Sequence, residues 1–305
     1  MQPIESAAIE AASARIASWI RVTPTLDIEA GGLAVDPVTL KLECFQHTGS
    51  FKPRGMFNRL LTASVPPVGV VAASGGNAGL AVAYAARALG HLATVFVPET
   101  APQVKVARLG QYGASVQRVG STYSEALAAS VHHATTTGAL FVHAYDQPEV
   151  VAGQGTLARE LGEVDTVLVA VGGGGLIAGV AGWYAGRVRV IAVEPIACPT
   201  YAAALDAGEP VDVAVGGVAG DSLGASRIGD LCWAARHWIT ASVLVTEDAI
   251  VRTQRRLWET CRVIAEPGGA TALAALASGE YKPESGERVV AVVCGANTDP
   301  AMGVT

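Results

Sequence analysis

The chain has 305 residues, of which half are hydrophobic and only 16% are charged, and its net charge at neutral pH is −6. A composition this apolar excludes a disordered or low-complexity protein, and the length suits one large α/β domain or two lobes that share a core. Basic residues form no block or stripe, so we expect neither a nucleic-acid partner nor binding to an anionic membrane surface.

Short β-branched runs alternate with alanine-rich stretches from one end of the chain to the other. The first 24 residues predict an amphipathic helix, and their early acidic residues are not typical of a signal peptide. Strands are then predicted at 38–43, 68–73, 93–97, 115–119, 139–143, 166–171, 188–193, 242–245 and 289–293. Helices are predicted at 77–89, 103–112, 123–136, 148–161, 176–185 and 247–260. This alternation, with continuous apolar strands, indicates parallel sheets covered by helices on both faces.

Residues 61–138 contain a complete strand–helix series and predict a smaller inserted α/β lobe, while residues 1–60 and 139–305 build a larger one. Two charge-free stretches, 60–86 and 166–186, reach the length of a membrane helix. Both are interrupted by proline or glycine runs, and irregular backbone facing lipid would leave amides unpaired. We therefore expect buried strand–loop–helix units and no membrane span.

The cysteines are few and show no short pairing pattern. They are Cys44, Cys198, Cys232, Cys261 and Cys294. An odd, scattered set without zinc-knuckle or redox spacing favours a reducing, cytoplasmic setting. The six histidines form no ligand pattern either, so no metal site is predicted from these residues.

The clearest candidate anion site is the run Gly172, Gly173, Gly174 and Gly175, which follows an apolar strand and opens an apolar helix. Glycines let the backbone curl around an anion while the helix N-terminus supplies free amides. The run lacks the Lys-Ser/Thr pair of a nucleotide P-loop and the spacing of a dinucleotide fingerprint. A tight turn kept for packing is the alternative, but four glycines exceed what packing should require, so the run predicts a phosphate cradle.

A second loop, residues 74–79, also lies between an apolar strand and a helix. Ser74 and Asn77 offer a hydroxyl and an amide beside bare backbone amides, which would suit a carboxylate. Asn77 as a plain helix N-cap fits the local sequence equally well.

Lysine is scarce, with only four in the chain, and one of them, Lys52, lies between Phe51 and Pro53 near a predicted helix start. Apolar surroundings could depress its pKa and make it a Schiff-base nucleophile, although a lone lysine near a helix start is usually a solvated surface residue.

Together, the lysine, the tetraglycine loop and the Ser-x-Gly-Asn loop resemble the fold-type II pyridoxal-phosphate family, in particular the serine/threonine dehydratases (ammonia-lyases). The resemblance covers nearly the whole chain and runs, in order, through residues 41–43, 48–55, 74–79, 172–175, 193–195, 266–267 and 293–295. Several motifs are weak alone, but the ordered set is specific. It implies two lobes, each an open, twisted, mainly parallel sheet, with pyridoxal 5'-phosphate between them.

The resemblance also implies roles for single residues. Lys52 would hold the cofactor and later act as base, and Phe51 would stack on one face of its ring, with Gly224 a candidate for the other. Gly172 to Gly175 and the amide of Leu176 would bind the phosphate. The cofactor's phenolic oxygen would accept a hydrogen bond from Asn77.

The substrate carboxylate, on the same resemblance, would lie at Ser74, Gly75, Asn77 and Ala78. Cys294 falls where the family places a Ser or Cys beside the pyridine nitrogen. A thiol would not keep that nitrogen protonated, so the ring would be a weaker electron sink. Loss of a β-hydroxyl in step with Cα deprotonation is then favoured. The alternative for Cys294 is a buried structural cysteine that ends a strand.

The chain also departs from the family's patterns. Serine racemases of the family carry a serine where this chain has Gly75, so efficient racemisation is not expected. Metal-activated members have an Asp where this chain has Thr200, which leaves Glu194 as a weak metal candidate that fits a simple strand-end carboxylate equally well. The chain ends just after the strand before Cys294, so the regulatory domain of biosynthetic threonine dehydratases is not expected.

The resulting prediction is a homodimeric dehydratase that converts L-threonine and/or L-serine to a 2-oxo acid and ammonia. Alternatives are β-replacement, as in cysteine or cystathionine synthesis, a dehydratase for a specialised substrate such as 3-hydroxyaspartate, and a non-catalytic binding protein on the same scaffold.

Overall fold

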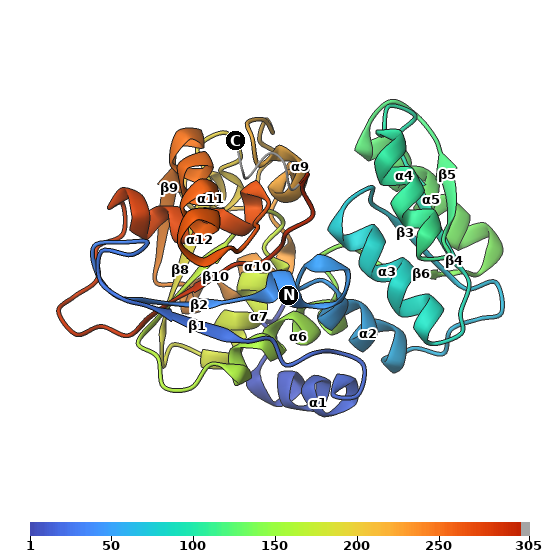
Figure 1. Cartoon of the computed structure of the whole chain (residues 1–305). Coiled ribbons are helices and arrows are strands. Elements are labelled where there is room, and N and C mark those ends of the chain that lie inside the picture. Colours follow the sequence, from blue (N-terminus) through green and yellow to red (C-terminus); the bar gives the residue numbers. More distant parts are fainter. Residues whose placement is uncertain (300–305) are drawn as a thin grey trace.

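The computed structural model describes residues 1–299, which form two separate β-sheets with helices packed around them (Figure 1). The larger sheet has the strand order β1-β2-β10-β7-β8-β9 and the smaller one β5-β4-β3-β6. β1 runs antiparallel to β2, and the remaining strand pairs are parallel. The predicted α/β class with mainly parallel sheets is confirmed.

The elements have the following bounds. The strands are β1 (Thr25–Ile28), β2 (Val38–Lys41), β3 (Val70–Ala73), β4 (Ala93–Val97), β5 (Ser115–Arg118), β6 (Leu140–Phe141), β7 (Thr166–Ala170), β8 (Arg189–Pro195), β9 (Ala241–Val245) and β10 (Val289–Val292). The α-helices are α1 (Ser6–Ile16), α2 (Pro53–Thr62), α3 (Asn77–Ala88), α4 (Gln103–Gln111), α5 (Tyr123–Thr137), α6 (Pro148–Gly155), α7 (Gly175–Tyr184), α8 (Thr200–Ala207), α9 (Gly220–Leu223), α10 (Asp230–Ala235), α11 (Glu247–Cys261) and α12 (Pro267–Ser278).

Right-handed crossovers account for the helices on both faces of the larger sheet. The chain moves from β7 through α7 to β8 and on to β9, and then returns through α11 and α12 to β10 on the other side of β7. Because such crossovers are almost always right-handed, reversing the direction of travel places α12 on the face opposite α7. α12 packs across β7, β8, β9 and β10. The inner strands are therefore buried on both faces, which explains their continuous apolar sequences.

The smaller sheet follows the same rule. The chain passes from β3 through α3 to β4 and through α4 to β5, and then returns through α5 to β6 beside β3. α3 packs on β3 and β4, and α5 packs on β3, β4 and β6. α2 contacts both α3 and α6, so it lies where the helices around the two sheets meet (Figure 1).

The proposed limits of the smaller lobe, 61 and 138, stay a prediction. β6 pairs with β3, so the smaller sheet includes two residues that follow position 138. The strand expected at 139–143 is shorter than predicted, at Leu140–Phe141.

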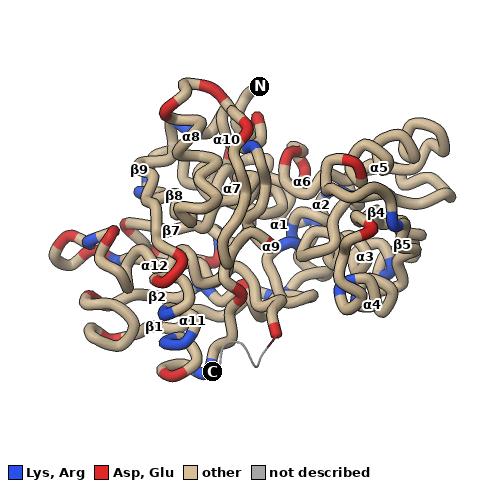
Figure 2. The backbone as a smooth tube through the Cα atoms, turned by 90° about the horizontal axis from the view of Figure 1, so that it is seen from above, with Lys and Arg blue, Asp and Glu red and all other residues tan. Residues whose placement is uncertain are grey.

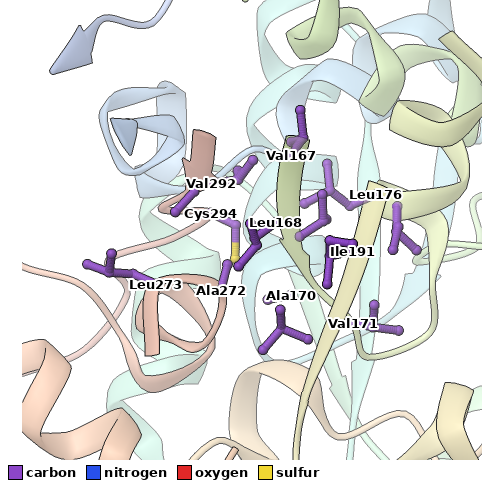
Figure 3. Packing of buried hydrophobic residues seen from close by; sticks show 14 of the residues in the cluster. Val167, Leu168, Ala170, Val171, Leu176, Ile191, Ala272, Leu273, Val292 and Cys294 are labelled. Carbon is purple, nitrogen blue, oxygen red and sulfur yellow. The ribbon is translucent and has the colours of Figure 1, made fainter. Parts of the chain in front are cut away.

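A continuous apolar cluster fills the space between the larger sheet and its helices. Figure 3 shows side chains from β7, β8, β10, α7 and α12 packed against one another, with the sulfur of Cys294 among them. The strands that lead to Cys294 and to the glycine run are thus anchored in this buried cluster.

Charged residues lie interspersed along the chain, with both signs near both sheets (Figure 2). Across residues 1–299, no helix combines the length and apolar character needed to cross a membrane.

Candidate active site

Lys52 is the residue immediately before α2, and its side chain reaches the gap between the two sheets. Its Nζ donates a hydrogen bond of 2.8 Å to the carbonyl oxygen of Ala144. Burial lowers the pKa of Lys52 from 10.5 to about 8, and nearby Cys294 and Glu266 oppose this shift. A lysine with such a pKa is neutral for a useful fraction of the time near pH 8, so it can act as a nucleophile or a base.

A buried ionic cluster fixes the turn that carries Lys52. Arg54 pairs with Glu43 at 2.8 Å and with Glu160 at 2.6 Å, and Lys41 pairs with Glu160 at 2.5 Å. Lys41 also donates to the carbonyl oxygen of Thr23 at 2.7 Å. Because the charged atoms are matched by partners, the cluster can remain ionised in the interior and hold the start of α2 in place.

The glycine run ends β7 and begins α7, as predicted. A Cβ at Gly173 would lie 2.5 Å from ring atoms of Tyr145, and one at Gly175 would lie 2.5 Å from the Tyr145 carbonyl oxygen. Gly174 has φ +84°, and a Cβ there would lie 2.5 Å from the sulfur of Cys232. A Cβ at Gly172 would likewise lie 2.9 Å from the Leu223 carbonyl oxygen. Close neighbours therefore demand glycine at all four positions, and the expectation that four glycines exceed what packing requires was wrong.

Packing and anion binding are nevertheless compatible in this loop. Within residues 1–299, the backbone amides of Gly172 to Leu176 donate no hydrogen bond to another protein group. Five free amides at the start of an apolar helix, with no side chains to obstruct them, form the donor set that a phosphate requires. The residues present therefore fit the phosphate of the predicted cofactor.

Two adjoining cavities open beside these groups. The smaller, about 50 Å³, is lined by Phe51, Lys52, Asn77, Tyr145, Ala170, Gly172 to Gly175, Leu176, Ser222, Leu223, Glu266 and Cys294. The larger, about 460 Å³, is lined by the loop 74–78 together with Lys52, Lys105, Tyr123, Tyr145 and residues 220–225. The predicted cofactor residues, apart from Gly224, thus surround the smaller cavity, and the predicted carboxylate loop borders the larger one.

The loop 74–79 presents open backbone to the larger cavity. A Cβ at Gly75 would meet only Val97, at 3.7 Å, and one at Gly76 would lie 3.8 Å from the Asp221 carbonyl oxygen, so neither position is crowded. A Cβ at Gly79 would instead overlap the carbonyl oxygen of Ser74. Gly79 is thus needed for packing, whereas Gly75 and Gly76 leave room for a ligand.

Asn77 is not the N-cap of α3, so the plain capping alternative was wrong. The N-cap position is Gly76. Among the residues described, no side chain caps this helix end, and the Asn77 amide is bound elsewhere: its Nδ2 donates to Glu266 at 2.6 Å and its Oδ1 accepts from Asn297 at 2.6 Å.

Cys294 lies two residues after the end of β10 and lines the smaller cavity. Its thiol is 3.4 Å from the carbonyl oxygen of Gly268, and burial raises its pKa further above the ordinary value. The group is therefore a neutral thiol and a packed core residue (Figure 3), and its predicted place beside the pyridine nitrogen stays a prediction.

Gly224 borders the larger cavity, whereas its neighbours Ser222 and Leu223 border the smaller one. The position opposite Phe51 that was predicted for Gly224 stays a prediction.

Glu194 caps a helix. Its carboxylate accepts hydrogen bonds from the amides of Tyr201 at 2.7 Å and Ala202 at 2.9 Å and from the Thr200 hydroxyl at 3.0 Å. Burial raises its pKa to about 7. Within residues 1–299, no group of three or more His, Cys, Asp or Glu side chains is placed to hold a metal ion.

Sequence reasoning assigned no role to Tyr145, Ser222, Leu223 and Glu266, although all four line the smaller cavity. Tyr145 follows a strand, where ligand loops are expected, but its sequence context has no distinctive motif. Glu266 lies in a segment that carried the family resemblance, and its burial could not be read from the sequence.

Comparison with known proteins places this geometry in a family. Residues 16–295 match the family described as "Pyridoxal-phosphate dependent enzyme". The L-threonine ammonia-lyase of Geobacter sulfurreducens is 38% identical over 273 residues, which cover 86% of this chain and 68% of that protein. Maize serine racemase superposes with a TM-score of 0.91 at 32% identity, covering 98% of this chain and 95% of the other.

The processed form of threonine deaminase isoform 2 from Solanum lycopersicum has a TM-score of 0.88 at 29% identity, covering 98% of this chain and 87% of the other. The predicted family and cofactor are thus confirmed. The chain belongs to the pyridoxal-phosphate dependent enzymes, of fold type II.

Proposed function

We propose that this chain dehydrates and deaminates a β-hydroxy L-amino acid, with L-threonine as the first substrate to test. The substrate loses its Cα proton and its β-hydroxyl as water. The released unsaturated amine then takes up water and yields a 2-oxo acid and ammonia. The similarity to threonine ammonia-lyases confirms the predicted class, a pyridoxal-phosphate dependent lyase.

One structural observation carries this proposal: three kinds of group open onto the same two adjoining cavities. These groups are the Lys52 amine, the free amides of the glycine run and the open loop 74–78. An amine beside an anion cradle suits an aldehyde cofactor with a phosphate, and the open loop suits a carboxylate. Because Lys52 borders both cavities, it can act first on the cofactor and then on the substrate.

Bound pyridoxal phosphate supplies an electron sink that acidifies the Cα proton of an attached amino acid. We propose that Lys52 takes up this proton, because its lowered pKa leaves the neutral amine available near pH 8. The amides of Gly75, Asn77 and Ala78, with the Ser74 hydroxyl, would hold the substrate carboxylate, while the Gly76 amide donates to Ser74 Oγ at 3.3 Å. Cys294, which lines the same cavity, would place a neutral thiol beside the pyridine nitrogen, and a thiol would not keep that nitrogen protonated.

Racemisation is the activity that the similarity to serine racemases raises as an alternative. It requires a second proton carrier on the face of Cα opposite Lys52. Position 75, where racemases of the family have a serine, is glycine in this chain, and the nearest atom to a Cβ there is Val97 Cγ1. We therefore propose elimination as the main reaction.

L-Serine as a second substrate, a homodimeric assembly and a cytoplasmic location are further proposals that rest on the family resemblance and on the scattered cysteines. Light scattering coupled to gel filtration would test the assembly: a mass of twice 31.1 kDa supports it, and a mass of 31.1 kDa contradicts it.

The experiment is a product assay on purified protein with pyridoxal phosphate, with a panel of β-hydroxy L-amino acids and no thiol. We expect release of 2-oxo acid and ammonia from threonine or serine, and loss of this activity in Lys52→Ala. Turnover that appears only when a thiol is added would favour β-replacement. Turnover of 3-hydroxyaspartate alone would favour a specialised dehydratase, and a protein that binds the cofactor but turns over nothing would favour a binding role.

A further inference from the structure

Four side chains form one continuous hydrogen-bond chain beside the cofactor cavity. Arg108 Nη2 donates to Asn297 Oδ1 at 2.6 Å, Asn297 Nδ2 donates to Asn77 Oδ1 at 2.6 Å, and Asn77 Nδ2 donates to Glu266 Oε1 at 2.6 Å. Arg108 and Asn77 come from α4 and α3 beside the smaller sheet, whereas Asn297 and Glu266 lie beside the larger one. This chain of hydrogen bonds therefore spans the boundary between the two sheets.

Arg108 gives this hydrogen-bond chain a direction. A guanidinium only donates hydrogen bonds, and a backbone carbonyl oxygen only accepts them, whereas an amide presents a donor on one side and an acceptor on the other. Because Arg108 donates to Asn297 Oδ1, Asn297 turns its Nδ2 toward Asn77, which then presents its Oδ1 to Asn297 and its Nδ2 to Glu266. Asn297 is held further because its Nδ2 also donates to the carbonyl oxygen of Thr48 at 2.7 Å.

Glycines in the surrounding backbone leave room for these hydrogen-bonded side chains. Glu266 is only 5% exposed, and a Cβ at Gly295 would overlap its Oε1. A Cβ at Gly49 would lie 3.1 Å from Asn297 Oδ1. The missing side chains at Gly49 and Gly295 leave space for these polar groups. Burying polar groups costs folding free energy unless each one has a hydrogen-bond partner, so this arrangement of partners is specific.

We propose that Glu266 and Asn297 are positioning residues that orient the Asn77 amide so that it offers a hydrogen to the cofactor. Asn77 Nδ2 carries two hydrogens, of which Glu266 takes one, and Asn77 lines the cavity that also contains Lys52. A reversed amide would instead present its oxygen to the cofactor's phenolic oxygen and repel it. This inference rests on the proposed function, because it assumes that Asn77 faces the cofactor there.

The decisive variant is Asn297→Asp, which keeps the shape but replaces the donor toward Asn77 with an acceptor. The Asn77 oxygen would then face a carboxylate, and its amide could no longer satisfy both neighbours. Titration of the cofactor-free protein with pyridoxal phosphate should show about tenfold weaker binding, the size expected for one lost hydrogen bond to a charged group. The maximum of the visible absorption band should also move.

Three further variants complete the set. Glu266→Leu removes the oxygen that accepts from Asn77 and should weaken cofactor binding about tenfold, whereas Glu266→Gln keeps such an oxygen and should restore binding to within about threefold of the unmodified protein. Arg87→Gln is the matched control, because Arg87 lies on the same helix as Asn77 but donates to the Gln111 carbonyl oxygen away from the cavity. It should leave both the affinity and the band unchanged.

A second readout needs no cofactor. The side-chain amide NMR signal of Asn77, assigned by its loss in Asn77→Ala, should shift in Asn297→Asp and stay in place in Arg87→Gln. If Asn297→Asp binds the cofactor like the unmodified protein and leaves this signal in place, the inference is overturned. If the unmodified protein itself shows no visible cofactor band, the proposed function fails, while the amide signal still decides the orientation of Asn77.

Discussion

Gly173→Ala tests whether the glycine run is held by its neighbours as the structure shows. The new Cβ would lie 2.5 Å from three ring atoms of Tyr145, whereas ordinary contacts begin near 3.4 Å, so the ring or the loop must move by about 0.9 Å. A shift of the Tyr145 ring would disturb the hydrogen bond of its hydroxyl to the Arg227 carbonyl oxygen, at 3.2 Å, and its edge-to-face contact with His143. Overpacking of this kind costs about 1–3 kcal/mol.

For a chain of this size, such a cost should lower the melting temperature by roughly 2–5 °C. Displacement of the loop should also weaken binding of pyridoxal phosphate, since the free amides would no longer converge. Differential scanning calorimetry of the cofactor-free protein and titration with the cofactor measure the two effects separately.

Gly75→Ala is the matched control, because it places the same methyl group in the other glycine loop, 3.7 Å from its nearest neighbour. It should leave the melting temperature within about 1 °C, as expected for an uncrowded substitution. If Gly173→Ala melts and binds the cofactor like the unmodified protein, the close packing of the run against Tyr145 is refuted.

The remaining predictions concern the lysine, the buried carboxylate and the ionic cluster. Lys52→Ala should fold but should not retain pyridoxal phosphate covalently after borohydride reduction, as mass spectrometry would show; a retained adduct would place the cofactor on another residue. Burial raises the pKa of Glu266 from 4.5 to about 7, so the folded protein binds the extra proton and stability falls as pH rises from about 4.5 to 7. Glu266→Gln should flatten this fall in urea unfolding at pH 5 and pH 7.5, and an unchanged slope would contradict the shift. Arg54→Met leaves the carboxylates of Glu43 and Glu160 without their main partner and should cost about 3–5 kcal/mol in urea unfolding, whereas a loss under about 1 kcal/mol would contradict a paired cluster.

Much of the fold could be predicted from the sequence, since its strands are apolar runs between clear helices. The omissions have physical causes. α12 is buried on nearly all sides, so it has no polar face and no helical periodicity. β1 has four residues and lies at the sheet edge, where half-exposed side chains give a weak pattern.

The candidate site was predictable where glycine or lysine stands in a distinctive order, as at Lys52 and Gly172 to Gly175. The roles of Glu266 and Asn297 were not, because each depends on a partner about 190 residues or more away in sequence. The local sequence at Asn77 fits an N-cap as well as a site residue. In the structure Asn77 is the first residue of the helix, and its amide binds Glu266 in the site.

Product formation from L-threonine tests the proposed activity most directly. Purified protein with pyridoxal phosphate and no thiol should convert L-threonine to equal amounts of 2-oxobutanoate and ammonia, and Lys52→Ala should form neither. A protein that shows the visible cofactor band but forms no 2-oxo acid from threonine or serine would contradict the proposed dehydratase activity.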